Sequence, residues 1–175
     1  MTHLSLRSMA RTLSLFIGVF TATFLYATPS FGRDLQGRVG LGMNGNFPNQ
    51  RGNSIDGKGI ALKYGFTKDL AVEPVIAFST GTSAQSTFGL KFFKNIFYET
   101  NLNFYFFGAG ALMKNSGDSS YALQSGFGAE FFIPGIESLG FSFELGAELS
   151  DTYGNSTSLR TLGMTFVDAG MRFYF

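Results

Sequence analysis

The feature that most constrains this chain is an alternation of side-chain character with a period of two residues. In residues 70–79, for example, bulky apolar side chains such as Ile76 alternate with Ala71, Glu73 and Ala77. Successive side chains of a β-strand point to opposite faces of the sheet, so this period predicts strands rather than helices. The same pattern recurs in seven further stretches, which are 38–44, 60–65, 87–92, 101–106, 121–131, 141–149 and 167–175. The chain is therefore predicted to be all-β, with eight strands.

The two faces of these strands differ in a way that separates a membrane barrel from a soluble sandwich. One face is large and aromatic, and the other consists of glycine, alanine and charged residues. The chain holds 22 Phe and 23 Gly, and only 14 % of its residues are charged, against roughly 25 % in soluble domains. A soluble sandwich buries its bulky side chains between two sheets and exposes mostly polar side chains, and not a glycine-rich face, to water. A small barrel in lipid needs bulky residues outside and little volume inside. We therefore predict an eight-stranded antiparallel up-and-down transmembrane β-barrel.

The predicted connections alternate in length, as they do in membrane barrels. Longer or polar connections are expected near 46–57, 80–85, 114–119 and 151–157, and tight ones near 67–69, 94–96 and 133–138. An even number of strands with this alternation places both ends of the barrel on the short-turn side, which is periplasmic in bacterial outer-membrane barrels.

Residues 1–32 have the organisation of a secretory signal peptide. Two arginines, Arg7 and Arg11, precede an uncharged apolar stretch at 13–26, and small residues follow before position 33. Cleavage after Ala27 is an alternative. The other interpretation, a transmembrane anchor, is weaker because the apolar stretch is shorter than the ~20 residues that a spanning helix needs.

Export of residues 33–175 as the barrel domain changes the composition that matters. Loss of two arginines leaves 11 basic residues against 12 acidic ones, and the only histidine, His3, is lost as well. Without histidine no Ser–His nucleophile can form, and without cysteine there is no disulfide, thiolate zinc site or thiol nucleophile. Balanced charge argues against a nucleic-acid partner. We predict no enzyme activity, no metal site and no cofactor.

The alternation also places a set of charged side chains inside the barrel. These are Arg38, Lys63, Glu73, Lys91, Glu130, Glu144, Glu148, Asp168 and Arg172. Buried charges must be paired, and here four positive groups meet five negative ones. We predict a salt-bridged plug in the periplasmic half, with only Glu148 higher and a hollow lined by Gly, Ala and Ser above it. Glu144 and Glu148, together with Glu130 on a neighbouring strand, could supply the pair of carboxylates that glycoside hydrolysis uses. Ion pairing with the basic residues is the simpler explanation of these three carboxylates.

Other residues are candidates for contacts at the two membrane surfaces. Basic side chains on the longer connections are candidates for contacts with lipopolysaccharide phosphates, and polar ones there for a cation site, although they are more simply solvated. The basic residues are Arg51, Lys58 and Lys114, and the polar ones are Asp118, Asp151 and Asn155. An aromatic girdle is expected near the short turns, formed by Tyr64, Phe66, Tyr98, Phe173 and Phe175.

The last eight residues, 168–175, carry a family resemblance. Gly170, Phe173 and the final Phe175 follow the spacing of the C-terminal signal of bacterial outer-membrane β-barrels. With the signal peptide and the eight strands, the chain resembles the OmpA-like transmembrane domain and OmpX-like proteins. The resemblance implies a location in the outer membrane, contacts with its lipid and lipopolysaccharide, and recognition of the last strand by the barrel-assembly machinery through strand pairing.

The predicted function follows from the same resemblance. We expect a monomeric, non-catalytic outer-membrane barrel that contributes to envelope integrity or surface interaction. The sequence departs from full OmpA-like proteins in stopping at Phe175 without a peptidoglycan-binding domain, which puts the cell-wall tethering of that family in doubt here. A narrow porin-like channel is the alternative, although eight strands leave an interior that side chains just fill. A histidine-free lipid-modifying barrel enzyme is the third possibility.

Overall fold

The computed structural model describes residues 34–44, 59–79, 85–115, 118–151, 157–162 and 168–175. The predicted signal peptide at 1–32 lies outside these residues. The described chain forms nine strands: β1 (Val39–Asn44), β2 (Gly59–Gly65), β3 (Leu70–Ser79), β4 (Gln85–Glu99), β5 (Leu102–Asn115), β6 (Asp118–Ile133), β7 (Ile136–Asp151), β8 (Thr157–Thr161) and β9 (Asp168–Tyr174). No helix among the described residues is long and apolar enough to cross a bilayer.

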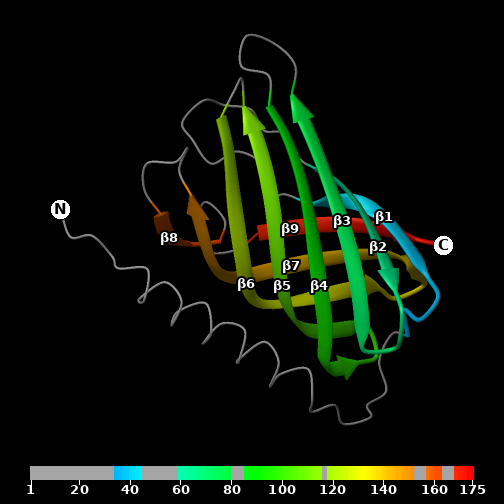
Figure 1. The fold of residues 1–175 in the computed structure, drawn as a ribbon. Helices are drawn as coiled ribbons and strands as arrows, with labels where there is room; N and C mark the ends of the chain where they lie inside the picture. The colour runs from blue at the N-terminus through cyan, green and yellow to red at the C-terminus, as the bar shows by residue number, and fades with distance from the viewer. Residues whose placement is uncertain (1–33, 45–58, 80–84, 116–117, 152–156, 163–167) are drawn as a thin grey trace.

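The strands close into one antiparallel barrel. They are hydrogen-bonded in the order β6-β5-β4-β3-β2-β1-β9-β7, and a further pairing of β6 with β7 completes the ring. Figure 1 shows β3 to β6 side by side at the front, with β7, β9 and β1 crossing behind them. Strand β8 pairs with β7 beyond β9, so β8 and β9 together occupy the eighth position of the ring. The prediction of an eight-stranded antiparallel barrel is thereby confirmed.

The eighth position is split because the last part of the chain contains extra residues. β8 pairs with Ala147–Asp151 of β7, and β9 pairs with 139–144. Only two β7 residues separate these pairing regions, whereas 162–167 separate β8 from β9. The backbone N–H of Leu162 donates to the carbonyl oxygen of Gly146 at 2.9 Å, and the Leu162 side chain is buried. The alternation predicted β9 but not β8.

Two predicted connections differ from the structure. The tight connection expected near 94–96 is wrong, because β4 continues to Glu99 through a β-bulge between Asn95 and Phe97. A bulge adds one residue to one strand and so interrupts the two-residue period that the sequence analysis follows. The connection expected near 114–119 is shorter than predicted, since β5 and β6 remain paired as far as Asn115 and Asp118.

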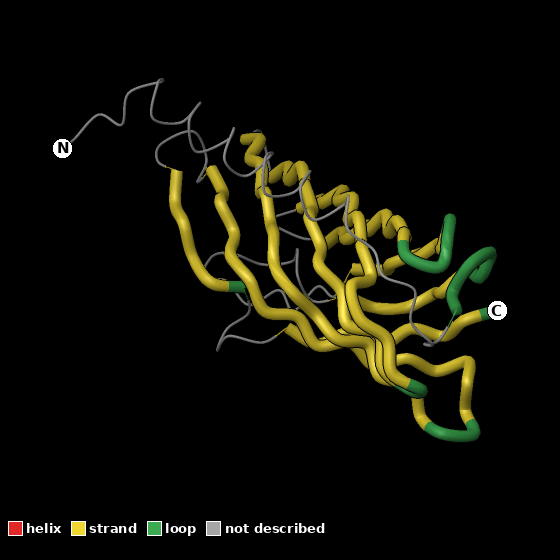
Figure 2. The backbone as a smooth tube through the Cα atoms, turned by 90° about the horizontal axis from the view of Figure 1, so that it is seen from below, coloured by secondary structure: helices red, strands yellow, loops and turns green. Residues whose placement is uncertain are grey.

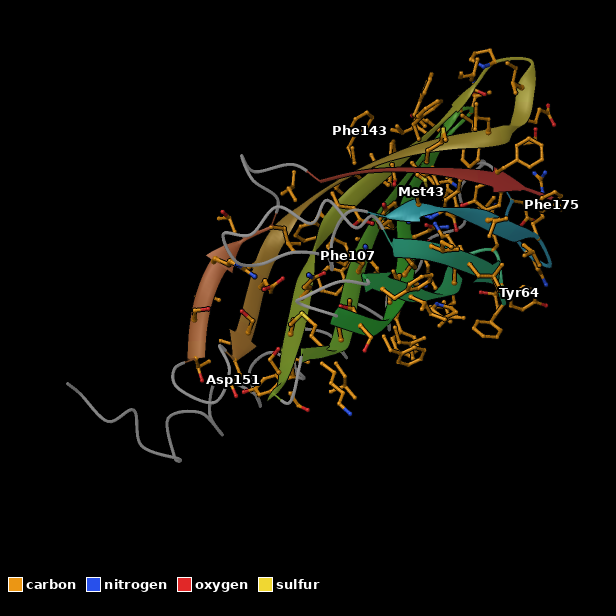
Figure 3. The ribbon with its side chains drawn as sticks, turned by 90° about the horizontal axis from the view of Figure 1, so that it is seen from above. Met43, Tyr64, Phe107, Phe143, Asp151 and Phe175 are labelled. Carbon is orange, nitrogen blue, oxygen red and sulfur yellow. The ribbon has the colours of Figure 1, made fainter. Side chains whose placement is uncertain are left out.

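The two ends of the barrel differ in their connections. The turns after β2, β4 and β6 are short, and Figure 2 shows most of these turns gathered at the end where the C-terminus lies. Figure 3 places Tyr64 and Phe175 at this end, which we call the short-turn end, and Asp151 at the opposite end. The connections at that opposite end lie mostly outside the described residues.

The side chains obey the predicted division between the two faces. Large apolar residues remain exposed on the outside of every strand, as Phe78 (71 %), Leu112 (68 %) and Leu159 (69 %) illustrate. Inward positions of the same strands, such as Ala61 and Val75, are fully buried. The outer surface is therefore the more apolar one, as a barrel surrounded by lipid requires.

Glycine allows β6 and β7 to approach each other closely. Gly126 and Gly146 lie directly opposite each other in the ladder. A Cβ on Gly126 would lie 2.1 Å from the carbonyl oxygen of Leu145, and a Cβ on Gly146 would lie 2.3 Å from that of Ser125. Because both obstacles are backbone atoms of the neighbouring strand, no side-chain rotation relieves the contact.

We therefore expect Gly126→Ala to weaken the barrel. The added methyl group must push β6 and β7 apart, and overpacking of this kind costs about 1–3 kcal/mol in the free energy of unfolding. Urea denaturation in detergent micelles measures the loss. Gly110→Ala is the control, since a Cβ there would meet only the Leu123 side chain at 3.6 Å. Equal stability of the two variants would contradict the close-approach explanation.

Candidate functional site

The interior of the barrel gathers most of the charged side chains that the sequence places inward. Seven of the nine predicted residues are at most 2 % exposed, namely Lys63, Glu73, Lys91, Glu130, Glu144, Glu148 and Arg172. Six of them, all except Glu148, form one group that we call the interior network. It consists of three cations and three carboxylates, so its formal charges cancel.

Arg172 on β9 is the centre of the interior network. Its Nε and Nη2 donate to the two carboxylate oxygens of Glu73, with 3.0 Å between Nη2 and Oε1. Its Nη1 donates to Oε1 of Glu130 at 3.3 Å and to the hydroxyl of Ser142 at 2.9 Å. Bidentate pairing of a guanidinium with a carboxylate is among the strongest ion-pair geometries. Since β3, which carries Glu73, is not a neighbour of β9 in the ring, this pair connects strands across the barrel.

Glu130 on β6 receives a second cation and a hydroxyl. Its Oε2 lies 2.8 Å from Nζ of Lys63, which extends from β2. Its Oε1 accepts a hydrogen bond of 2.6 Å from the hydroxyl of Tyr174. Every one of these side chains is buried, so the carboxylate depends on the two cations and the tyrosine in place of water.

Lys91 and Glu144 form the third ion pair of the interior network. Nζ of Lys91 contacts Oε2 of Glu144, and the Tyr105 hydroxyl donates to Oε1 of the same carboxylate at 2.9 Å. The Phe93 ring joins this pair to the rest, because Lys63 Nζ lies 4.3 Å and Lys91 Nζ 5.5 Å from its centroid. Cations above an aromatic face are attracted by the ring quadrupole, so Phe93 partly replaces water for them.

Large aromatic side chains inside the barrel are a difference from the predicted small or charged inner face. The buried rings at inward positions are Phe93, Tyr105, Phe107, Phe132 and Tyr174. Three of them belong to sequence doublets, at 92–93, 106–107 and 131–132. In a strand, the two members of a doublet must point to opposite faces. The doublets were therefore a signal in the sequence that one ring of each pair faces inward.

Glycine makes room for two of these rings. A Cβ on Gly128 would lie 2.6 Å from the Tyr105 ring, and a Cβ on Gly40 would lie 2.6 Å from the Tyr174 ring. The glycines on the inner face thus accommodate aromatic rings instead of lining a hollow at these positions.

Glu148 lies nearer the opposite end and has its own partners. Arg160 on β8 donates from Nε (3.0 Å) and Nη2 to its Oε1, while the Gln124 amide donates to its Oε2 at 2.7 Å. Sequence analysis missed Arg160 because β8 was not predicted. Glu130, Glu144 and Glu148 are thus each paired with a cation and buried, and they offer no exposed carboxylate to a polysaccharide.

Of the two remaining predicted residues, the structure describes the side chain of Arg38 only. Arg38 precedes β1 at the short-turn end and is half-buried, with its guanidinium carbon 5.9 Å from the centroid of the Tyr174 ring. Arg38 lies between the turn at Gly37 and the start of β1, and the ring that its guanidinium approaches is itself buried. The Asp168 backbone pairs with Glu144, but its side chain falls outside what the structure describes.

Four of the five residues predicted for an aromatic girdle are exposed at the short-turn end. Tyr64 and Phe66 are exposed and stack edge to face at 5.1 Å, as do Phe173 and Phe175. Tyr98 is instead buried. Its hydroxyl bonds the carbonyl oxygen of Lys68 and the carboxylate of Asp69, so this ring holds the turn between β2 and β3.

The other candidate residues are only partly described. Lys114 is exposed near the end of β5, Asp151 is half-buried at the end of β7, and Gly170 pairs with Asn44 and Ser142. Arg51, Lys58 and Asn155 and the Asp118 side chain lie outside the description. In the part of the chain that the structure covers, no three His, Cys, Asp or Glu side chains are grouped as metal ligands would be.

Comparison with known proteins supports the fold at low sequence identity. No protein-family profile and no curated protein matches the chain. Among solved structures, it is similar to the N-terminal β-barrel domain of OprF from Pseudomonas aeruginosa, with a TM-score of 0.56. The identity is 12 %, and the match covers 80 % of this chain and 98 % of that one. The chain thus has the fold of the small eight-stranded barrels that its sequence resembles.

The interior network generates a stability prediction. Glu73→Gln leaves Arg172 buried with its bidentate partner gone, and breaking a buried pair from one side costs about 3–5 kcal/mol. Urea denaturation in detergent micelles measures the effect.

Glu99→Gln is the matched control, because Glu99 ends the neighbouring strand β4 but is exposed. It should change the free energy of unfolding by less than about 1 kcal/mol. Loss of stability in both variants alike would show that burial of the Glu73–Arg172 pair is not responsible.

Proposed function

We propose that this chain is a non-catalytic, monomeric β-barrel protein of a bacterial outer membrane, exported through a cleaved signal peptide, which contributes to envelope integrity or surface interaction. The observation that carries the proposal is the contrast between the two faces of the barrel. The outside is a belt of exposed bulky apolar side chains, and the inside holds a buried network of balanced charge.

The outer belt supports a membrane environment. Exposed apolar residues occur on all nine strands, from Leu41 on β1 to Met171 on β9. Removal of one such side chain from water lowers the free energy by about 1.5–3 kcal/mol. A continuous apolar surface of this extent indicates contact with lipid or with another protein. A closed barrel also pairs all of its backbone N–H and C=O groups within the sheet, which is necessary in hydrocarbon because no water is there to bond them. The similarity to the β-barrel domain of OprF agrees with the closed barrel fold that this environment requires.

The sealed interior favours a structural role over a channel. A water-filled pore would leave its lining side chains accessible, but Glu73, Lys91, Glu130 and Arg172 have no exposed surface. The aromatic rings among them fill the same cross-section. The carboxylates that would serve an enzyme are held by cations, which supports a non-catalytic role as well.

Two partners are part of the proposal. The barrel-assembly machinery would recognise the last strand through Gly170, Phe173 and Phe175, of which the two phenylalanines are exposed on β9 and at its end. Lipopolysaccharide phosphates would be contacted by exposed basic residues at the end opposite the short turns, among them Lys114.

A conductance measurement distinguishes a closed barrel from a channel. The purified protein, inserted into planar lipid bilayers from detergent, should give no steady single-channel steps, because the interior network blocks the lumen. Membrane fractionation of the producing bacterium should recover the chain with the outer membrane. Regular conductance steps would favour the channel instead, and recovery as a folded monomer in buffer without detergent would refute the membrane location.

A second prediction concerns the last strand. Phe175→Ala removes an exposed ring without disturbing the interior, so in detergent the variant should refold with a free energy of unfolding within about 0.5 kcal/mol of the parent. In cells it should reach the outer membrane in smaller amounts. Met171→Ala, an outward position of the same strand that the signal does not include, should assemble normally. Equal assembly of both variants would argue against recognition through Phe175.

A further inference from the structure

The segment before β1 folds across the short-turn end of the barrel. Gln36 forms a parallel bridge with Gly65 at the end of β2. The Gly37 N–H donates to the Gly65 carbonyl at 2.9 Å, and the Gly65 N–H donates to the Arg38 carbonyl at 3.3 Å. Gly37 has a φ of 73°, a conformation that glycine adopts without steric cost. We call residues 34–38 the N-terminal strap.

The strap buries one apolar side chain, Leu35, against the end of the barrel. Leu35 is 3 % exposed and packs in one cluster with Phe132 of β6 and Tyr174 of β9. The hydroxyl of Tyr174 donates to Glu130, which belongs to the interior network. Leu35 and the two rings therefore form the layer between the interior network and the short-turn end.

We propose that the N-terminal strap is a releasable stopper that controls the access of water and small solutes to the interior network from the short-turn end. This inference goes beyond the proposed structural role, and it does not depend on which membrane holds the barrel. It assigns a separate function to Leu35, which no sequence motif indicated.

The fit of the strap is specific. A Cβ on Gly65 would lie 2.1 Å from the carbonyl oxygen of Leu35, so the strap docks closely only because position 65 is glycine. The Asp34 carboxylate accepts a hydrogen bond of 2.9 Å from the Gln36 N–H and stabilises the turn locally.

The attachment is also slight enough to open without unfolding the barrel. The strap is held by its two backbone hydrogen bonds with Gly65, by the buried Leu35 side chain and by the Arg38 guanidinium beside the Tyr174 ring. By comparison, β5 and β6 are paired over fourteen residues. Segments with few buried contacts open at a free energy well below that of global unfolding. Release of the strap would leave the paired strands of the ring and the interior network around Arg172 in place.

Thiol labelling tests the stopper directly, because the natural chain contains no cysteine. Ser142→Cys places a reporter in the interior beside Arg172, at a position that is 2 % exposed. The folded variant in detergent micelles is treated with a water-soluble methanethiosulfonate reagent, and the labelling rate is measured. Asn103→Cys, also fully buried on β5, is a second reporter that leaves the Arg172 contact intact.

Two changes should open the stopper by different means. Leu35→Ala removes the buried side chain, and Gly65→Ala blocks docking of the strap while Leu35 is kept. Each substitution should raise the labelling rate of either reporter by roughly tenfold. Electrophoretic mobility on gels of unheated samples checks that the barrel is still folded.

Leu162→Ala is the matched control, since Leu162 is also a buried leucine but packs with Phe93, Tyr105 and Phe107, away from the strap. It should leave the labelling rate near that of the parent. Unchanged labelling in the Leu35→Ala and Gly65→Ala variants would overturn the proposal. An equal increase in the Leu162→Ala variant would overturn it too, because general loosening of the barrel would then explain the access.

Discussion

The pairing of Arg172 with Glu73 and Glu130 is the interaction on which the rest of the structure depends. An arginine at this position is fully buried, and removal of its charge from water is tolerable only if carboxylates take the place of the solvent. The carboxylates come from β3 and β6, on other sides of the ring. The barrel must therefore close before the charge is satisfied, which links closure of the sheet to formation of its interior.

The same constraint explains the composition of the inner face. Six charged side chains and several aromatic rings share a lumen that eight strands leave narrow. Glycines at 40 and 128 provide the space for the Tyr174 and Tyr105 rings. The hydroxyl groups of these tyrosines donate hydrogen bonds to Glu130 and Glu144. Small residues, aromatic rings and charges on the inner face are thus parts of one arrangement.

Much of this fold follows from the alternation alone, while its irregularities do not. The period of two residues predicted the eight-stranded ring and directed Glu73, Lys91 and Arg172 inward, because strand geometry fixes the side of each residue. The period of two residues did not predict the bulge after Asn95 or strand β8, because no local sequence pattern indicates the extra residues at these places. Arg160 was missed with β8. Leu35 was missed because its burial results from a contact between the strap and the barrel end, which period-two analysis does not address.

The central claim is that the apolar face of the barrel contacts lipid while the charged face is enclosed. The chain has no tryptophan, so single tryptophans report one position each. Leu112→Trp and Phe107→Trp place the indole on the outer and inner faces of the same strand, β5. In vesicles of brominated lipid, the account predicts strong quenching of fluorescence at position 112 and little at position 107. Equal quenching at both positions, or stronger quenching at position 107, would contradict it.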